Sequence, residues 1–252
     1  HLHQWHGDPV TPNASLDHLV IAADSLDQGV AWCEATLGVT PAAGGEHPLM
    51  GTHNRLLRLE GTRYPGAYLE IIAINPAAAD PGRRRWFDLD DGALREAVRS
   101  EPRLVHFVAA TGAAAASVRA LSALGIDRGP LLQAQRPSPD GLLRWQISVR
   151  DDGQRLFYGA LPTLIQWDSP HPAGKLPPSG LELEALHASH PRPADLQAAC
   201  AAIGLQDVAV NAGAPNLVAV FHTPRGRVLL EAKGLCCWPC PPWPAAHRRS
   251  VR

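Results

Sequence analysis

Leu16-Asp17-His18-Leu19-Val20 recurs 88 residues later as Leu104-Val105-His106-Phe107-Val108, and this pair of stretches decides the fold. Each has one histidine third in a short apolar strand, and each leads into an alanine-rich amphipathic helix that ends at a glycine, Gly38 or Gly125. The histidine-to-glycine distance is 20 residues in the first copy and 19 in the second. The chain therefore contains a duplicated unit whose two histidines can meet at one shared site.

The composition is that of a globular protein without the charge expected for binding nucleic acid or a membrane surface. The chain has 252 residues, 45% of them hydrophobic, which is enough for a sizeable core. The net charge of −1 offers no basic surface for nucleic acid, and no apolar run reaches the roughly 18 residues of a membrane span. Five cysteines are an odd number, and the N-terminus does not resemble a secretory signal. We therefore expect a cytoplasmic protein that binds neither nucleic acid nor membrane.

Strand and helix patterns repeat along the chain with the order strand, helix, strands. The first unit is predicted as a strand over 16–23, a helix ending at Gly38, and strands over 54–60 and 68–74. The pattern recurs fainter at the C-terminus, where a helix ends at Gly204. The predicted segments are an irregular arm (1–15), a first βαβββ module with its connector (16–101), a second module (102–172), a third module (180–232) and a disordered tail (233–252).

One polar residue stands out in the last strand of each duplicated unit. Glu70 lies among apolar residues, where a carboxylate is costly unless it is paired, exposed or bound to a cation. Gln166 is taken as its counterpart in the second unit. With His18 and His106 they form a set that suits a divalent transition metal with open positions for water or substrate. The alternative, that each histidine is an ordinary half-buried strand residue, stays open.

The segments around His18, Met50-Gly51-Thr52-His53-Asn54-Arg55-Leu56, Tyr68-Leu69-Glu70 and Pro162-Thr163-Leu164-Ile165-Gln166-Trp167-Asp168 resemble the glyoxalase-like domain proteins of bacteria. These proteins are part of the vicinal oxygen chelate superfamily. The resemblance covers roughly residues 16 to 190 and implies an α+β fold in which two βαβββ modules pair into a cupped sheet of the glyoxalase/bleomycin-resistance type. The third related module at the C-terminus departs from the two-module plan.

The resemblance also implies a function. One divalent metal (Zn, Ni, Mn or Fe) would be held by His18, Glu70, His106 and Gln166. The protein would then be a metal-dependent lyase or isomerase acting on a small oxygen-rich metabolite, with Glu70 as the catalytic base. The alternative is a metal-free protein of the same fold that sequesters a small molecule, as resistance proteins do.

Further residues are assigned by analogy to the substrate pocket. They are His53, Asn54, Arg144, Trp145 and Trp167. The run Arg83-Arg84-Arg85-Trp86 is interpreted as a solvated loop, with a lid over the cup as the alternative. The pattern Cys237-Trp238-Pro239-Cys240 is discounted as a redox motif, because Pro241 and Pro242 forbid the helix that such a motif needs. A homodimer in which the third module completes a sheet with its copy is a further hypothesis.

Overall fold

The computed structural model describes residues 11–232, so the predicted tail over 233–252 lies outside the described residues, as do the first ten residues of the predicted arm. The first module consists of β1 (Ser15–Ala22), α1 (Leu26–Leu37), β2 (Ala42–His47), β3 (Thr52–Arg58) and β4 (Tyr68–Ile74). Helix α1 begins after Ser25, whose hydroxyl accepts a hydrogen bond from the N–H of Gln28, and ends at Gly38 in the left-handed conformation. The predicted helix end is confirmed.

The second module follows the connecting helix α2 (Gly92–Ser100) and repeats the plan. It contains β5 (Arg103–Ala110), α3 (Ala114–Ala123), β6 (Leu131–Ser138), β7 (Gly141–Ser148), the short 3-10 helix η1 (Phe157–Gly159) and β8 (Thr163–Trp167). Pro137 lies near the end of β6. Proline is tolerated there because β6 is an edge strand.

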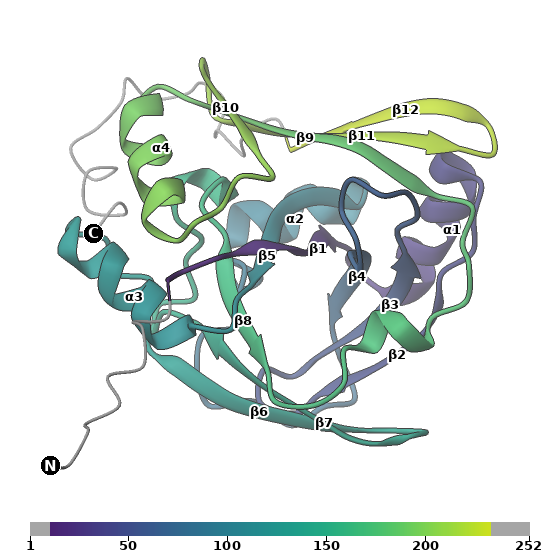
Figure 1. The fold of residues 1–252 in the computed structure, drawn as a ribbon. Coiled ribbons are helices and arrows are strands. Elements are labelled where there is room, and N and C mark those ends of the chain that lie inside the picture. Colours follow the sequence, from purple (N-terminus) through teal and green to yellow (C-terminus); the bar gives the residue numbers. More distant parts are fainter. Residues whose placement is uncertain (1–10, 233–252) are drawn as a thin grey trace, which may run out of the picture.

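The two modules share one curled sheet of eight strands in the order β2-β3-β4-β1-β5-β8-β7-β6 (Figure 1). The two histidine-bearing strands, β1 and β5, pair antiparallel at its centre, with His18 opposite Val108 and Val20 opposite His106. The outer strands β2 and β6 are not hydrogen-bonded to each other, so the curled sheet is nearly closed without being a barrel. The predicted cup of paired βαβββ modules is confirmed, and we call the concave face of this sheet the cup.

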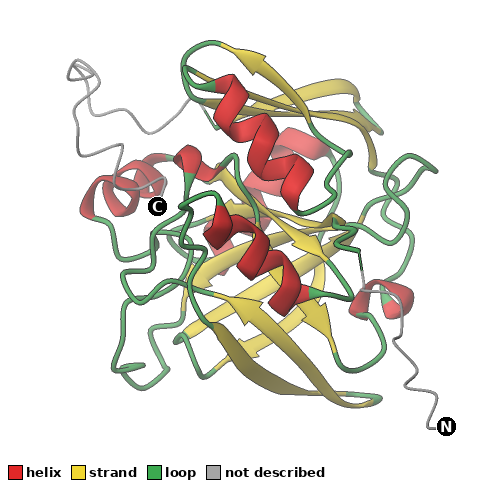
Figure 2. Cartoon of the chain, turned by 60° about the vertical axis from the view of Figure 1, so that its left-hand side comes forward, coloured by secondary structure: helices red, strands yellow, loops and turns green. Residues whose placement is uncertain are grey.

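The C-terminal unit repeats the order of elements but arranges its strands differently. It consists of β9 (Glu182–His190), α4 (Pro193–Ala202), β10 (Ala209–Ala212), β11 (Asn216–Thr223) and β12 (Gly226–Glu231), reached through the 3-10 helix η2 (Pro172–Lys175). In the first module, the parallel neighbour of the first strand is the last one, β4. In the C-terminal unit the parallel neighbour of β9 is β10, and the sheet order is β10-β9-β11-β12. The small sheet lies across the large one, with helices between them (Figure 2).

The C-terminal unit is joined to the cup by one apolar core. Leu183 and Leu196 belong to the same buried cluster as Leu69 of β4 and Leu121 of α3. Tyr64 adds a polar link: its hydroxyl accepts a hydrogen bond from the N–H of Leu186 at 3.0 Å. Burial of apolar surface on both sides therefore holds the unit against the outer face of the cup.

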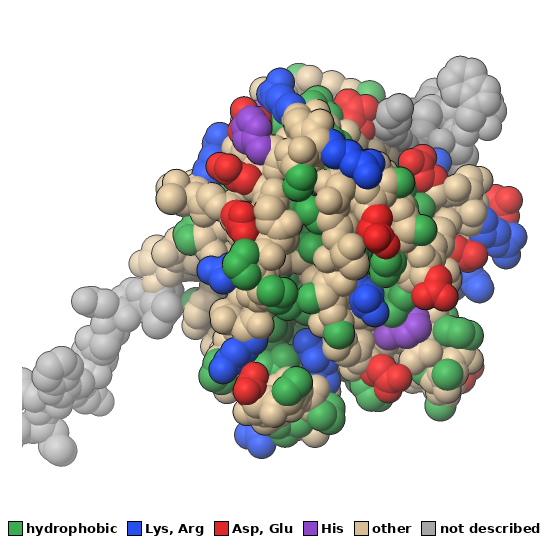
Figure 3. Space-filling model, turned by 90° about the vertical axis from the view of Figure 1, so that its right-hand side faces the viewer, with side chains coloured by type: hydrophobic (Ala, Val, Ile, Leu, Met, Phe, Trp, Pro, Cys, Tyr) green, Lys and Arg blue, Asp and Glu red, His purple; other side chains and the backbone are tan. Residues whose placement is uncertain are grey.

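Acidic and basic side chains are interspersed over the face shown in Figure 3. No helix among residues 11–232 has the length and apolar character needed to cross a membrane.

Candidate active site in the cup

A small cavity lies inside the cup, lined mainly by strands of both modules. Its volume is about 30 Å³, room for about two water molecules. Most of its polar lining comes from the first module, including His18, His47 and Glu70, whereas the second module contributes Arg136 and otherwise mainly apolar and aromatic groups. The chemistry of the cup is therefore concentrated in one half.

His18 stands between two buried carboxylates. Its Nδ1 lies 2.6 Å from Oδ2 of Asp17, and its Nε2 lies 3.5 Å from Oε1 of Glu70. Burial by itself lowers the pKa of His18, but the hydrogen bonds and negative charges of the two carboxylates outweigh burial and raise that pKa to about 9. At neutral pH the group is therefore an imidazolium ion between two carboxylates.

Asp17 holds His18 and also ties down the segment that follows β8. Its Oδ1 accepts a hydrogen bond from Nε1 of Trp167 at 3.0 Å and lies 2.7 Å from Nε2 of His171. Burial opposes ionisation of Asp17, but the hydrogen bonds from His171 and His18 prevail and lower its pKa. The ring of Tyr68 stacks on His18 with centroids 4.6 Å apart. These contacts fix the orientation of the His18 ring.

Glu70 is oriented from the opposite side by the amide of Asn54. Nδ2 of Asn54 donates to Oε2 of Glu70 at 2.7 Å and lies 3.2 Å from Nε2 of His47. The backbone N–H of Gly45 in turn donates to Oδ1 of Asn54 at 2.9 Å. The pKa of Glu70 is lowered: burial opposes ionisation, and the proximity of His18 outweighs it. Oε1 of Glu70 is buried and makes no hydrogen bond of normal geometry. Its polar neighbour is Nε2 of His18, at the ion-pair distance of 3.5 Å.

His106 occupies the matching strand but has a different role. Its Nδ1 lies 2.8 Å from the carbonyl of Gly159, and its Nε2 accepts a hydrogen bond from the N–H of Thr163 at 3.1 Å. Burial lowers its pKa well below the usual value, and the charge of Arg128 adds to the effect. His106 is thus a neutral, fully hydrogen-bonded core residue and does not line the cavity.

Gln166 also lies away from the cup. Its Oε1 accepts a hydrogen bond from the N–H of Ala114 at 3.0 Å and so caps the first turn of α3. The strand register explains the difference from the sequence prediction. In the first module Val20 is opposite Glu70, whereas in the second the corresponding Val108 is opposite Thr163. The structural counterpart of Glu70 is therefore Thr163, and Gln166, three residues later, faces the other side of the sheet.

The predicted metal set is therefore not assembled. The structure brings His18 and Glu70 together but uses His106 and Gln166 elsewhere. Within residues 11–232 no group of three or more His, Cys, Asp or Glu side chains is placed to hold a metal ion. The orphaned Oε1 of Glu70 and Nε2 of His18 would supply two ligands, fewer than the three protein ligands usual for a catalytic zinc site. The residues present do not fit a divalent metal.

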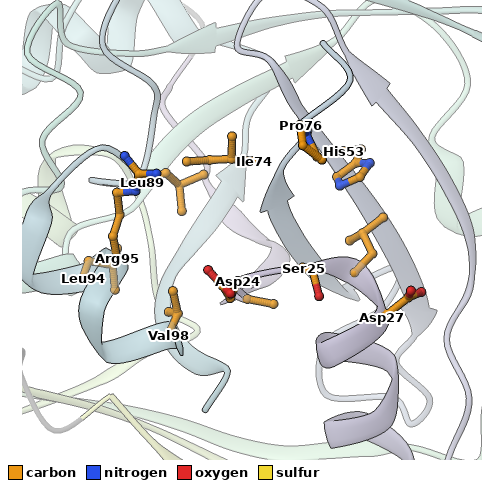
Figure 4. A pocket seen from close by; sticks show the side chains of 12 residues that line it. Asp24, Ser25, Asp27, His53, Ile74, Pro76, Leu89, Leu94, Arg95 and Val98 are labelled. Atoms are coloured by element: carbon orange, nitrogen blue, oxygen red, sulfur yellow. The ribbon is translucent and has the colours of Figure 1, made fainter. Parts of the chain in front are cut away.

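Of the residues predicted to bind substrate, Asn54, Trp145 and Trp167 line the cup cavity. Arg144 does not, because it alternates with Trp145 along β7 and is exposed. His53 lines a separate cavity of about 410 Å³ between the start of α1 and helix α2, where it faces Arg95 across the space (Figure 4). That cavity is the larger one, but its polar groups do not bond to one another as those of the cup do.

The arginine-rich connector closes one side of the cup. Trp86 is buried, lines the cavity and meets His47 edge-on with ring centroids 5.2 Å apart. Phe87 beside it has a positive φ, and Arg85 pairs with Asp90 at 2.7 Å. The connector is therefore a wall of the cup, as in the lid alternative, and not the solvated loop that its charges suggest.

Several residues of the candidate site were not identified from the sequence. They are Asp17, His47, Tyr68, Trp86, Arg136 and His171. Asp17 has a detectable signal, since an aspartate beside a strand histidine needs a partner when buried. His47 follows a glycine pair in β2, a strand without alternating apolar residues, and Arg136 lies on the edge strand β6. No local pattern places either of them in the cup.

The fold and the cup define a protein of the vicinal oxygen chelate superfamily. The family model for the glyoxalase-like domain matches residues 16–204, and the chain belongs to that family. No curated protein matches the chain.

The solved structures that resemble this chain share little sequence identity with it. A hypothetical protein from Staphylococcus aureus has 13% sequence identity, covers 80% of this chain and 87% of its own, and superposes with a TM-score of 0.57. Methylmalonyl-CoA epimerase from Mycobacterium tuberculosis has 17% identity, with 67% and 97% of the two chains covered and a TM-score of 0.38. At these identities the likeness concerns the fold alone.

Proposed function

We propose that the cup is the active site of an isomerase or lyase that moves a proton on a small, oxygen-rich anion. The observation that carries the proposal is Glu70, a buried carboxylate that lines the cavity and whose Oε1 has only the 3.5 Å ion-pair contact with His18. Because its pKa is lowered, Glu70 is ionised at neutral pH and available to accept a proton. Buried ionisable groups with shifted pKa values are typical of catalytic sites.

The neighbouring cations supply the complementary chemistry. Removal of a proton from carbon next to a carbonyl leaves negative charge on the carbonyl oxygen, and a donor placed at that oxygen lowers the barrier. His18 is protonated and close to Glu70, and Arg136 lines the same cavity. In the proposed step Glu70 takes the proton from carbon and Arg136 stabilises the negative charge that develops on the oxygens. His18 donates its proton to the carbonyl oxygen and takes the proton of the neighbouring hydroxyl, and Glu70 returns the first proton to the adjacent carbon. In a lyase the electron pair instead expels a leaving group.

Metal is not part of this proposal, because the donor set supplies only His18 and Glu70. The metal-dependent mechanism expected from the family resemblance is tested in the same assay. Exchange of carbon-bound hydrogen in D₂O is followed by NMR for pyruvate, 2-oxobutanoate and glycolaldehyde, first with chelator and then with added zinc, nickel, manganese or iron. Exchange that occurs only with added metal would contradict the metal-free reading.

The decisive variant is Glu70→Gln, which keeps the shape of the side chain and removes its basicity. We expect exchange to fall by about 10²–10⁴-fold. Glu34→Gln, a change at an exposed helix position, is the matched control and should leave exchange unaltered. Equal rates in the two variants would show that Glu70 is not the base.

The second candidate function is sequestration of a small molecule without reaction. The aromatic walls of the cavity favour it, since Trp86, Trp145 and Trp167 all line so small a space. Quenching of tryptophan fluorescence by a ligand, with no exchange in the wild-type protein, would support sequestration over catalysis.

A further inference from the structure

We propose that the ligand of the cup is an amphipathic carboxylate, with its anionic head at Arg136 and a medium-length hydrocarbon tail in a vestibule outside the cavity. The inference rests on the proposed function only in that the cup is the binding site. The vestibule is a second cavity of about 360 Å³, within the usual range of ligand pockets. It lies between the tip of the β6–β7 hairpin and the segment that carries η2.

The vestibule and the cup cavity are adjacent and share part of their lining. Leu56, Arg136 and Pro172 line both spaces. The inner cavity, at about 30 Å³, accepts only a few heavy atoms, so a larger ligand must extend outward past these three residues. The cavity beside α1 and α2 shares no lining residue with the cup and offers no such path.

The walls of the vestibule are mainly apolar. Leu142, Leu143 and Leu176 line it, together with Pro139 and Pro170. Leu142 is 41% exposed, one of only four large hydrophobic residues so exposed among residues 11–232. A leucine at a hairpin tip gains from contact with an apolar ligand because covering it removes apolar surface from water.

Arg136 supplies the charge that selects an anion. No carboxylate of the described residues lies within ion-pair distance of it, whereas the rim cation Lys175 is already 3.8 Å from Asp140. Burial lowers the pKa of Arg136, which shows that its charge is partly desolvated. A partly desolvated guanidinium without a partner binds a carboxylate in a bidentate way. Its place at the junction puts the head group beside Glu70 and leaves the tail in the vestibule.

The probes are straight-chain carboxylates from acetate to decanoate, titrated against the whole chain by tryptophan fluorescence. We expect the Kd to fall by up to about fourfold for each CH₂ that the vestibule covers. Leu142→Ser should reduce this dependence on chain length, and Leu229→Ser, an exposed leucine on β12, is the matched control. Arg136→Gln should raise the Kd of every probe by about tenfold or more while keeping the dependence on chain length.

A Kd that does not fall with chain length in the wild-type protein would overturn the proposal, as would equal effects of Leu142→Ser and Leu229→Ser. The Glu70→Gln variant separates this inference from the catalytic one. Chain-length dependence that survives in Glu70→Gln supports the vestibule. If the wild-type protein shows no proton exchange but its Kd still falls with chain length, the catalytic proposal alone is refuted.

Discussion

The buried imidazolium of His18 makes the stability of this protein depend on pH in a defined direction. Its pKa is about 9 in the folded protein and 6.5 when exposed to water. Between these values the folded state holds a proton that the unfolded state releases, so the free energy of unfolding falls as pH rises. The stabilisation is fully present below pH 6.5 and is lost through pH 9.

The size of the effect follows from the difference between the two pKa values. At pH 6.5 the bound proton contributes roughly 3 kcal/mol, and at pH 8 roughly 1.5 kcal/mol. We therefore expect His18 to contribute a loss of about 1.5 kcal/mol over this interval. His47 and His106 oppose it, because burial lowers their pKa values and each adds about 0.4 kcal/mol of stability as pH rises from 6.5 to 8. The expected net loss is about 0.7 kcal/mol. The buried thiols do not add to the pH dependence of stability in this interval. Their pKa values rise from 9.0 to about 12 for Cys33 and about 11 for Cys200, so both thiols stay protonated up to pH 8 in the folded and in the unfolded state.

The measurement is urea unfolding at half-unit steps from pH 6.5 to 8, followed by tryptophan fluorescence. His18→Gln should be less stable at pH 6.5, and its stability should no longer fall but rise slightly with pH, because only the opposing effect of His47 and His106 remains. The matched control is His222→Gln, at an exposed position on β11. A fall in stability with rising pH that persists in His18→Gln, or that is absent from the wild-type protein, would refute the view that His18 is an imidazolium between two carboxylates.

Three further substitutions test the packing around the site by urea unfolding. Gly44→Ala should destabilise the protein by about 1–3 kcal/mol, because a Cβ there would lie 2.1 Å from Oδ1 of Asn54. Arg128→Met should leave stability unchanged or raise it by about 1 kcal/mol or more, because two guanidinium nitrogens of this buried side chain lack partners. Tyr64→Phe should cost about 1–3 kcal/mol, since it leaves the N–H of Leu186 without its hydroxyl acceptor.

Each of these three predictions has an outcome that would contradict it. Gly112→Ala, where a Cβ meets nothing within 4 Å, is the control for the glycine, and equal effects would show that Gly44 is not needed for close approach. A marked loss of stability in Arg128→Met, compared with the exposed Arg119→Met, would mean that the buried guanidinium is paired. An unchanged unfolding midpoint in Tyr64→Phe would show that the link to the C-terminal unit contributes nothing.

Much of the fold could be predicted from local patterns. The bounds of β4 and β5 match the predicted strands because continuous apolar runs with sharp ends define both. Helix α1 was recognisable from its amphipathic spacing and from Gly38 at its end. By contrast, β2 reads Ala-Ala-Gly-Gly-Glu-His, a composition that does not favour a strand, and it forms because β3 pairs with it.

The candidate site could be predicted only within the first module. His18 and Glu70 lie on neighbouring strands of one module and were found together. The sequence analysis took Gln166, near the end of the last strand of the second module, as the counterpart of Glu70. The counterpart in the structure is Thr163, which is opposite Val108 as Glu70 is opposite Val20. Register between parallel strands depends on tertiary packing, and an offset of three residues turns a side chain to the other face. The roles of Thr163 and His106 were therefore not available from spacing alone.

The unpaired edges β2 and β6 give the curled sheet a seam that runs beside Arg136. A side chain at Gly45 would lie 2.6 Å from Nη1 of Arg136, so the two edges approach closely there. Parting them breaks no backbone ladder, whereas separating β6 from β7 disrupts eight paired positions. Hydrogen exchange at the seam should therefore report the least costly opening of the sheet, on the side where a ligand enters.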